Sequence, residues 1–415
     1  PPTMKRIISQ GVAIFMGLAG LGLLPTLSFA QSQEVQFLNQ HHQTFSVQAE
    51  GVLPSLSLLD PYLQGPEIIL AGEQHYLKES ADLRFFFLRY THQHAGVRYL
   101  LEELPFSMGY LLNQYVLSGD SSYLNRVFPH YSTPQRFKAW RSFYQKLAAF
   151  NQRLPLGDKI QVIGLDVERM TEFDWMVQNP AFRLLRSMLA QHQVPIGKVA
   201  DLYSCMGEME NYPFDEAVSK QVQSRMRSFV EYWYQEWDSF HEMLGEDFFA
   251  AHIMITGLHQ SWQYPGDKLA PYRDDFMYQS FRLLYPTFAV EARCFGQFGS
   301  IHTPLEAGKR PLGTQLQQAE HSPVRGRTLS IRYAYEGVIE KANANPRGLY
   351  REGDLIRDLP KRLQAPCLEA FSSAPQPILI QLDGLHSPFT DQARQFSFMV
   401  YVPLGVQYQN KFEKE

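Results

Sequence analysis

Short apolar segments rich in β-branched residues alternate with longer helical patterns from residue 67 onward. This alternation constrains the fold most, because neighbouring parallel strands need crossover helices, and those helices cover both faces of the sheet. The sequence therefore predicts an α/β fold, with a mostly parallel sheet flanked by helices and a helical insertion over the carboxyl ends of the strands. The expected strands are 67–71, 97–101, 159–164, 287–292, 328–332 and 377–382.

A long helical pattern separates the third and fourth expected strands. Apolar residues recur every three or four positions from Val218 to Leu244, which predicts one helix of roughly eight turns ending at Gly245. We expect its aromatic residues to pack in a core; an aromatic ligand box is the alternative. The preferred organisation is a single domain over residues 31–415, with the helical insertion at about 179–270.

The first thirty residues have the pattern of a secretory signal peptide. Lys5 and Arg6 precede an uncharged apolar stretch, and the small residues Ser28 and Ala30 fit a signal peptidase site. A membrane anchor is the alternative, but glycines and a proline interrupt the stretch. We therefore expect cleavage after Ala30, export to the periplasm or secretion, and no stable membrane anchor after cleavage.

Composition excludes several classes of protein. The chain has 415 residues, 45% hydrophobic and 19% charged, as in a folded globular protein. Lys plus Arg number 38 and Asp plus Glu 42, so the net charge is 38 − 42 = −4, and without the basic run that a nucleic-acid binder needs we expect no nucleic-acid partner. In an exported protein the three cysteines, Cys205, Cys294 and Cys367, allow one disulfide and one free thiol, and the sequence does not choose the pair.

Carboxylates and histidines gather directly after the expected strands. In an open parallel sheet, binding sites form outside the carboxyl ends of the strands. The polar residues in these positions, in strand order, are Glu73, His75 and Glu79; Glu102 and Glu103; Asp166 and Glu168; His302; and Asp383 and His386.

This set of side chains suits acid/base chemistry. A histidine held by a carboxylate can take a proton from water, and a second protonated histidine or an arginine can stabilise an oxyanion. Glu73 and His75 are two residues apart on a turn, Glu103 comes from the next strand, and Arg273 is the natural cation near these acids. Hydrolysis without a covalent nucleophile is therefore possible.

Structural roles compete with these functional ones. Glu73 could cap the following helix, and Asp166 could accept bonds from backbone donors in a buried turn. Cys294 could be a nucleophile paired with His302, although a buried strand cysteine is the commoner case. The chain lacks the G-x-S-x-G, H-E-x-x-H, phosphate-loop and G-x-G-x-x-G motifs, which disfavours standard serine hydrolases, zincins, nucleotide-dependent enzymes and Rossmann dehydrogenases.

Several of these segments together resemble the erythromycin esterase-like superfamily, which includes the haem-binding ChaN lipoproteins. The resemblance runs over roughly residues 67 to 316. Its segments are Leu70–His75 with Glu79; Glu103–Tyr110, Leu112–Tyr115 and Gly119–Asp120; Gly164–Asp166; Arg273–Asp274 with Met277; and Gly299–His302 with Leu312–Gly313.

The resemblance implies a metal-independent hydrolase in which a histidine activates water. Carried onto this chain, it implies His75 as general base, with Glu73 and Glu103 as its orienting or electrostatic partners. It further implies Arg273 as a substrate or oxyanion contact and His302 as a second polar contact.

Two positions depart from the esterase pattern. One residue separates Glu73 from His75, as in the ChaN form, where the esterases have two. Gly299 stands where the esterases have the first of two histidines three residues apart.

The leading hypothesis is an exported hydrolase that acts on an ester or related bond of a small molecule without a cofactor. The first alternative is a ChaN-like haem- or iron-binding protein without catalysis, with Tyr76 as a candidate ligand. The second alternative is a divalent-metal hydrolase that uses Glu73, His75 and His302.

Overall fold

The computed structural model describes residues 31–47, 51–75, 77–128, 135–168, 180–209, 216–264, 269–289, 291–336, 338–339, 360–383, 386–403 and 405–406. The helices are α1 (Gln33–Gln40), α2 (Lys78–Ala95), α3 (Phe106–Ser118), α4 (Ser121–Val127), α5 (Gln135–Asn151), α6 (Pro180–Gln191), α7 (Ile196–Met209), α8 (Glu216–Gln235), α9 (Trp237–Leu244), α10 (Phe248–Gln263), α11 (Ala270–Leu284), α12 (Leu312–Gln318), α13 (Lys361–Phe371) and α14 (Thr390–Gln395). The strands are β1 (His42–Thr44), β2 (Ile68–Glu73), β3 (Val97–Pro105), β4 (Gln161–Asp166), β5 (Arg293–Gly299), β6 (Thr328–Tyr335), β7 (Val338–Ile339), β8 (Ile378–Gln381), β9 (Phe398–Val402) and β10 (Gly405–Val406). The signal peptide predicted over residues 1–30 lies outside the described residues, as does Tyr76.

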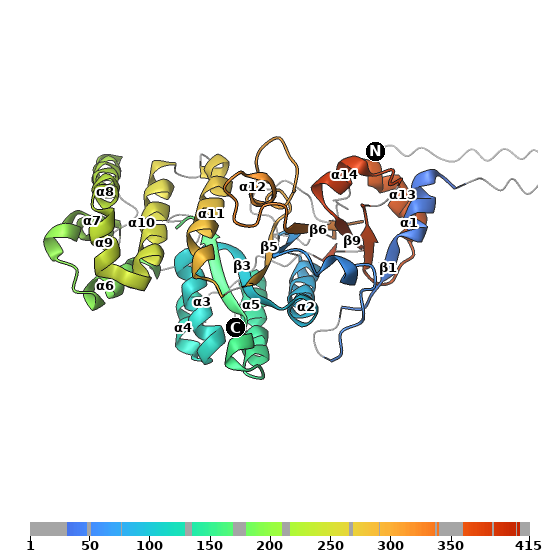
Figure 1. The fold of residues 1–415 in the computed structure, drawn as a ribbon, viewed down its shortest axis with the longest axis horizontal. Helices are drawn as coiled ribbons and strands as arrows, with labels where there is room; N and C mark the ends of the chain where they lie inside the picture. The colour runs from blue at the N-terminus through green and yellow to red at the C-terminus, as the bar shows by residue number, and fades with distance from the viewer. Residues whose placement is uncertain are drawn as a thin grey trace, which may run out of the picture.

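One sheet of eight strands runs through the middle of the molecule in the order β1-β8-β9-β6-β2-β5-β3-β4, and β7 pairs with β10 in a second, small sheet (Figure 1). The strands from β9 to β4 are parallel to one another, whereas β8 is antiparallel to both β1 and β9. The predicted α/β fold with a mostly parallel, helix-flanked sheet is thus confirmed.

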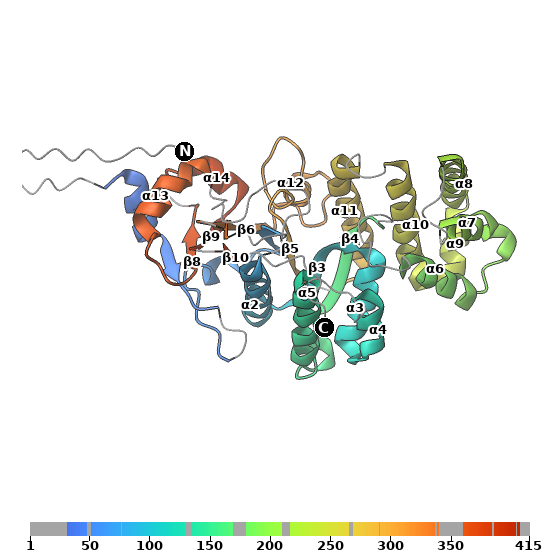
Figure 2. The same cartoon turned by 180° about the vertical axis from the view of Figure 1, so that it is seen from behind.

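Alternating side chains of each central strand enter two different cores. In β2, Ile68 and Leu70 pack with residues of α11 and α12, whereas Ile69 and Ala71 pack with residues of α2 and α5. Because successive strand residues point to opposite faces, a strand that is apolar at every position implies helices on both sides. Figure 2 shows these two helix layers from behind.

Five of the six expected strands lie where the sequence predicts them, but the fourth is wrong. Of the residues predicted there, 287–289 and 291–292 are described and form no strand: a 3-10 turn ends at Thr287, and Phe288 stacks on Tyr99 with 4.3 Å between ring centroids. The strand is Arg293–Gly299 instead, in the row between β2 and β3. The apolar residues of 287–292 therefore signal local packing rather than a place in the sheet.

The direction of β8 corrects a second expectation. Gln381, at the carboxyl end of β8, pairs with Phe398, at the amino end of β9. Asp383 and His386 therefore leave the sheet at the opposite edge from Glu73, Glu103 and the other strand ends considered above. These two residues do not belong to the same group of polar side chains.

The predicted long helix after β4 is two helices. α8 ends at Gln235 and α9 begins at Trp237, and Gly245 ends α9 with a φ of 53°, a conformation that favours glycine. The expectation that its aromatic residues pack in a core is confirmed: Trp233 is fully buried and stacks on Phe240 at 4.3 Å.

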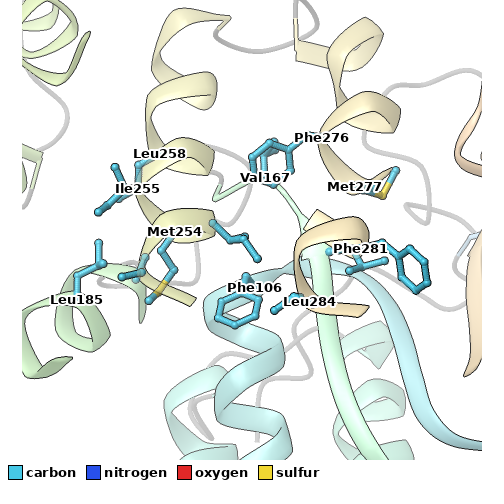
Figure 3. Packing of buried hydrophobic residues seen from close by; sticks show 14 of the residues in the cluster. Phe106, Val167, Leu185, Met254, Ile255, Leu258, Phe276, Met277, Phe281 and Leu284 are labelled. Carbon is cyan, nitrogen blue, oxygen red and sulfur yellow. The ribbon is translucent and has the colours of Figure 1, made fainter. Parts of the chain in front are cut away.

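Helices α6 to α10 extend beyond the β4 edge of the sheet (Figures 1 and 2). They join the sheet through one apolar core, which contains Met254 of α10, Phe106 of α3 and Phe276 of α11 (Figure 3). At the carboxyl end of β4, an added Cβ on Gly257 of α10 would lie 3.0 Å from the backbone nitrogen of Glu168. Helix α10 thus reaches the strand ends where the polar residues gather.

Candidate active site

The five predicted site residues lie in one cluster at the carboxyl ends of adjacent strands. Glu73 is the last residue of β2, and Glu103 lies near the end of β3. The turn after β5 provides His302, and Arg273 reaches the cluster from α11. His75 follows β2 on the same turn as Glu73. The strand order β2-β5-β3-β4 therefore joins residues that are far apart in the sequence.

Glu73 fixes the orientation of the His75 ring. Nδ1 of His75 lies 2.8 Å from Oε1 of Glu73. Because a carboxylate only accepts hydrogen bonds, Nδ1 carries the hydrogen, and Nε2 is the nitrogen that can take up a second proton. With 43% of its side chain exposed, His75 is more open to solvent than any other ionisable member of the cluster.

Glu103 lies between the two histidines. Its Oε2 is 3.8 Å from Nε2 of His75, and its Oε1 is 3.4 Å from Nε2 of His302. The same Oε2 accepts a 2.7 Å hydrogen bond from the backbone N–H of Gly299. This bond from β5 holds the Glu103 carboxylate in place between the rings.

Arg273 binds two carboxylates at once. Its Nη2 donates to Glu103 and to Asp166, at 2.6 Å each, and its Nε lies 3.1 Å from Oδ1 of Asp166. Two-point contacts between a guanidinium and a carboxylate fix both groups geometrically. In this arrangement Arg273 connects the ends of β3 and β4, and Asp166, for which the sequence left a structural role open, is its principal partner.

His302 contacts Asp274 through the ring nitrogen that does not face Glu103. Nδ1 of His302 lies 2.8 Å from Oδ1 of Asp274, which also accepts a bond from the backbone N–H of Leu312 at 2.8 Å. The exposed fraction of the His302 side chain is 3%. Carboxylates and imidazoles thus alternate through the cluster from Glu73 to Asp274, and His75 is its most exposed member.

The charges of this cluster favour protonated histidines. Burial lowers the pKa of His75, but Glu103 and Glu73 outweigh it and raise the pKa to about 9. Burial likewise lowers the pKa of His302, whereas Asp274 and Glu103 raise it to about 9. Burial alone would raise the pKa of Glu103, but His75, His302 and Arg273 together hold it well below its usual value.

Sequence reasoning missed Gln297. Its side chain amide, in the middle of β5, donates to Oε2 of Glu73 and also lies 3.3 Å from the backbone oxygen of Ser80. A polar residue inside the buried run Cys294–Phe298 is the available signal, but the predicted strand begins at residue 287, six residues before Arg293.

Glu168 lies next to the cluster without joining it. Its carboxylate accepts bonds from the backbone N–H and the hydroxyl of Ser107, at 2.8 and 2.6 Å, in the first turn of α3. Burial raises the pKa of Glu168 to about 7. The contact ties the end of β4 to α3, which is a structural role.

No group of three or more His, Cys, Asp or Glu side chains within the described ranges is arranged to hold a metal ion. In the predicted metal-binding set of Glu73, His75 and His302, the Glu103 carboxylate lies between His302 and His75. Cys205, Cys294 and Cys367 are all free and buried, so the disulfide that the sequence allowed is not formed. Burial raises the pKa of Cys205 to about 11 and that of Cys294 still further, which opposes a thiolate nucleophile.

Comparison with solved structures shows which class of fold this chain has: that of the erythromycin esterase-like proteins. It matches a single-residue variant of erythromycin esterase EreC in its open conformation, with a TM-score of 0.66 and 14% identity, over 88% of this chain and 98% of that one. A Bacillus cereus protein matches with a TM-score of 0.67 and 14% identity, and a succinoglycan biosynthesis protein with 0.64 and 12%; each match covers 91% of this chain and 98% of the other. At 12–14% sequence identity, these three matches show that the fold is shared.

Other comparisons add little. The match to ChaN of Campylobacter jejuni, solved with cofacial haem, has a TM-score of only 0.32, too low to argue from. No family model and no curated protein matches the sequence. Among the helices described, none has the length and apolar character needed to cross a membrane.

Proposed function

We propose that this protein is a hydrolase in which His75 activates water for attack on an ester or related bond of a small molecule. The observation that supports this most directly is the state of His75: its ring is oriented by Glu73, faces Glu103, and is the most exposed ionisable group of the cluster. A general base must be both fixed and accessible. The shared fold with erythromycin esterase agrees with this class of reaction.

The proposed reaction needs only water and the side chains present. Nε2 of neutral His75 takes a proton from water while the water oxygen bonds to the carbonyl carbon, and the carbonyl electrons move to oxygen. The tetrahedral intermediate then collapses, the bond to the leaving oxygen breaks, and the proton on His75 passes to that oxygen. The products are an acid and an alcohol, and His75 returns to its neutral form.

Arg273 and His302 support this step through charge. In the structure both are bound to Glu103, and each has a further carboxylate partner, Asp166 or Asp274. Their positive charges lie within the cluster and lower the energy of a nearby oxyanion. A closer contact with substrate, as the family resemblance implies, belongs to this proposal.

The protonation state of His75 sets the expected pH dependence. With a pKa of about 9, roughly one His75 in a hundred is neutral at pH 7, because the two values differ by two pH units. The value of kcat/KM should therefore rise about tenfold per pH unit above pH 7 and level off above about pH 9.

The test is hydrolysis of a panel of chromogenic esters by wild type and His75→Gln, with His94→Gln as control. The His94 side chain is 40% exposed and lies 3.7 Å from a carboxylate of Asp60, so it matches His75 in exposure and in having a carboxylate neighbour without lying in the cluster. We expect His75→Gln to abolish activity and His94→Gln to leave it unchanged. Full activity in His75→Gln would refute the proposal.

Two further measurements distinguish this proposal from the metal-dependent and haem-binding alternatives. Activity that persists after dialysis against a chelator agrees with water activation by His75 alone, whereas its loss and recovery with zinc or manganese would favour a metal site. A Soret band on titration with haem, without hydrolysis, would favour the haem-binding alternative.

We also propose that the chain is exported, on the basis of its first thirty residues. Expression in a bacterial host followed by N-terminal sequencing of the periplasmic fraction should give a chain that starts at Gln31. An unprocessed chain that stays in the cytoplasm would contradict export and leave the catalytic proposal standing.

A further inference from the structure

We propose that Gln297 is a positioning residue for His75: its side chain amide fixes the Glu73 carboxylate, and Glu73 in turn holds His75 with Nε2 as the basic nitrogen. This inference rests on the proposed function, because it assigns Gln297 a task in preparing the general base. Gln297 does not touch the reacting atoms.

The position of Gln297 is unusual for an amide. β5 lies between β2 and β3 in the sheet, and the strand residues on either side of Gln297 are glycine, phenylalanine and cysteine. The exposed fraction of Gln297 is 6%. Burying an amide costs free energy unless it forms hydrogen bonds, so a specific partner is expected.

The register of the sheet delivers the amide to Glu73. Gln297 pairs with Ala71 of β2, and Glu73 lies two residues further along the same face of that strand. The small side chain of Ala71 leaves room for the longer glutamine side chain to reach past it. At Glu73 the amide nitrogen donates to Oε2.

The same amide nitrogen is anchored to α2. It lies 3.3 Å from the backbone oxygen of Ser80, whose hydroxyl donates to the backbone oxygen of Gln74 at 2.9 Å. The Ser80 hydroxyl also shares a hydrogen bond of 2.6 Å with the hydroxyl of Tyr335. The amide therefore connects β5, the turn after β2 and the start of α2, and none of these can shift alone.

This arrangement divides the two oxygens of Glu73 between two neighbours. Gln297 occupies Oε2, so Oε1 is the oxygen that meets Nδ1 of His75. With the carboxylate unable to rotate, the hydrogen of the neutral imidazole stays on Nδ1 and the lone pair stays on Nε2. Gln297 thereby determines which nitrogen of His75 accepts a proton.

One substitution removes both contacts of the amide nitrogen, to Glu73 and to the backbone oxygen of Ser80, with little change in side-chain shape. The oxygen of the Gln297 amide is buried and has no hydrogen-bond partner among the atoms described, so only its nitrogen forms bonds. Gln297→Met keeps the length and approximate volume of the side chain and removes the donor. Gln315→Met is the matched control, since Gln315 is also buried, at 2% exposed, and its amide donates to the backbone oxygen of Arg310 at 3.0 Å.

The experiment is a ¹⁵N NMR titration of the histidines, with the His75 signals identified by their loss in His75→Gln. Among the residues that the structure describes, Glu73, Glu103 and His302 are titratable groups that face His75. In wild type and Gln315→Met we expect neutral His75 to be the Nδ1–H form. In Gln297→Met we expect a mixture of both tautomers and a lower titration midpoint, because the Glu73 contact loosens. On the plateau above about pH 9, where His75 is neutral in both proteins, the accompanying loss in kcat/KM should be about 10- to 100-fold, as for one hydrogen bond to a charged group.

The His75 tautomer measured by NMR tests this inference separately from the proposed function. An unchanged tautomer and midpoint in folded Gln297→Met would overturn the role of Gln297, whatever its effect on activity. If Gln297→Met does not fold, Gln297→Asn is the variant to test, because its side chain is one methylene shorter and cannot reach Glu73 in the same way. Unchanged His75 signals in Gln297→Asn would overturn the inference equally. Conversely, a shifted tautomer in a protein whose hydrolysis does not depend on His75 would sink the proposed function and leave the positioning intact.

Discussion

Nε2 of His75 and Oε2 of Glu103 are 3.8 Å apart. This distance is too long for a direct hydrogen bond and short enough for a strong interaction between charges. Glu103 therefore acts on His75 through its charge alone, whereas Glu73 acts through a hydrogen bond in addition to its charge. The two carboxylates have separable effects, which mutagenesis can distinguish.

Replacing Glu103 by glutamine should make His75 easier to deprotonate. Glu103→Gln keeps the shape of the side chain and removes the negative charge that stabilises the imidazolium, so the midpoint of His75 should fall from about 9 by about one to two pH units. The rising limb of the pH profile of kcat/KM should move by the same amount. An unmoved midpoint would mean that Glu73 alone sets the pKa.

The neighbouring Glu102 provides the contrast, because it points to the other face of β3. It forms a buried ion pair with Arg84 and accepts a 3.1 Å bond from the hydroxyl of Tyr144. Glu102→Gln should cost about 3–5 kcal/mol of unfolding free energy, since it leaves the Arg84 charge buried without its partner. Denaturant unfolding measures this loss, and the His75 titration should stay as in wild type. A shift of His75 as large as that in Glu103→Gln would contradict the separation of the two faces.

A methyl group at residue 299 should disturb His75 directly. An added Cβ on Gly299 would lie 2.8 Å from Nε2 and 3.1 Å from Cε1 of His75, so the ring has to move. For a displacement on the order of 1 Å, Gly299→Ala should lower kcat/KM about 100-fold. At Gly157 an added Cβ meets nothing within 4 Å, and Gly157→Ala is the control. Equal activities of the two variants would show that the ring has room to shift.

His252 should make the protein less stable in mild acid. It is buried among aromatic rings, accepts a 3.1 Å bond from the indole N–H of Trp233, and has a pKa lowered by burial to about 4. Because the unfolded chain takes up this proton near pH 6.5 and the folded one only near pH 4, the contribution of neutral His252 is complete above pH 6.5. It is lost as the pH falls toward 4 and amounts to about 3 kcal/mol.

The control for this effect is His252→Asn, which keeps an acceptor for Trp233 and does not titrate. Unfolding free energies at pH 7 and pH 4.5 should differ less in this variant than in wild type. Equal pH dependence in the two proteins would assign acid sensitivity to other groups, such as the carboxylates of the site.

The sequence predicts most of the sheet because buried strands such as β2 and β6 are apolar at nearly every position. It fails at β5 because of the contacts that this strand makes. Two glycines and a glutamine lower the strand propensity of that segment. Gly296 leaves room for Leu101 and Gly299 for His75, and Gln297 donates a hydrogen bond to Glu73. The more strand-like residues 287–292 attract the prediction instead.

For the site, placing strand ends on one edge suffices to predict that Glu73, Glu103 and His302 meet. The apolar pattern of a strand does not show in which direction the strand runs in the sheet. An antiparallel β8 reads like a parallel one, so Asp383 and His386 could not be separated from the cluster before the pairing with β9 was known. The three-way contact of Arg273, Glu103 and Asp166 likewise depends on how α11 packs, which periodicity alone does not specify.

The alternation of carboxylates and imidazoles across β2, β3, β5 and α11 has a consequence for folding. Glu73 and His302 are 302 − 73 = 229 residues apart, and no stretch of neighbouring residues contains even half of the cluster. The site thus has no local precursor and exists only when the long-range strand pairs have formed. Recovery of His75 titration during refolding would consequently report the pairing of β2, β5 and β3, and a proteolytic fragment that stops short of β5 would retain none of the chemistry.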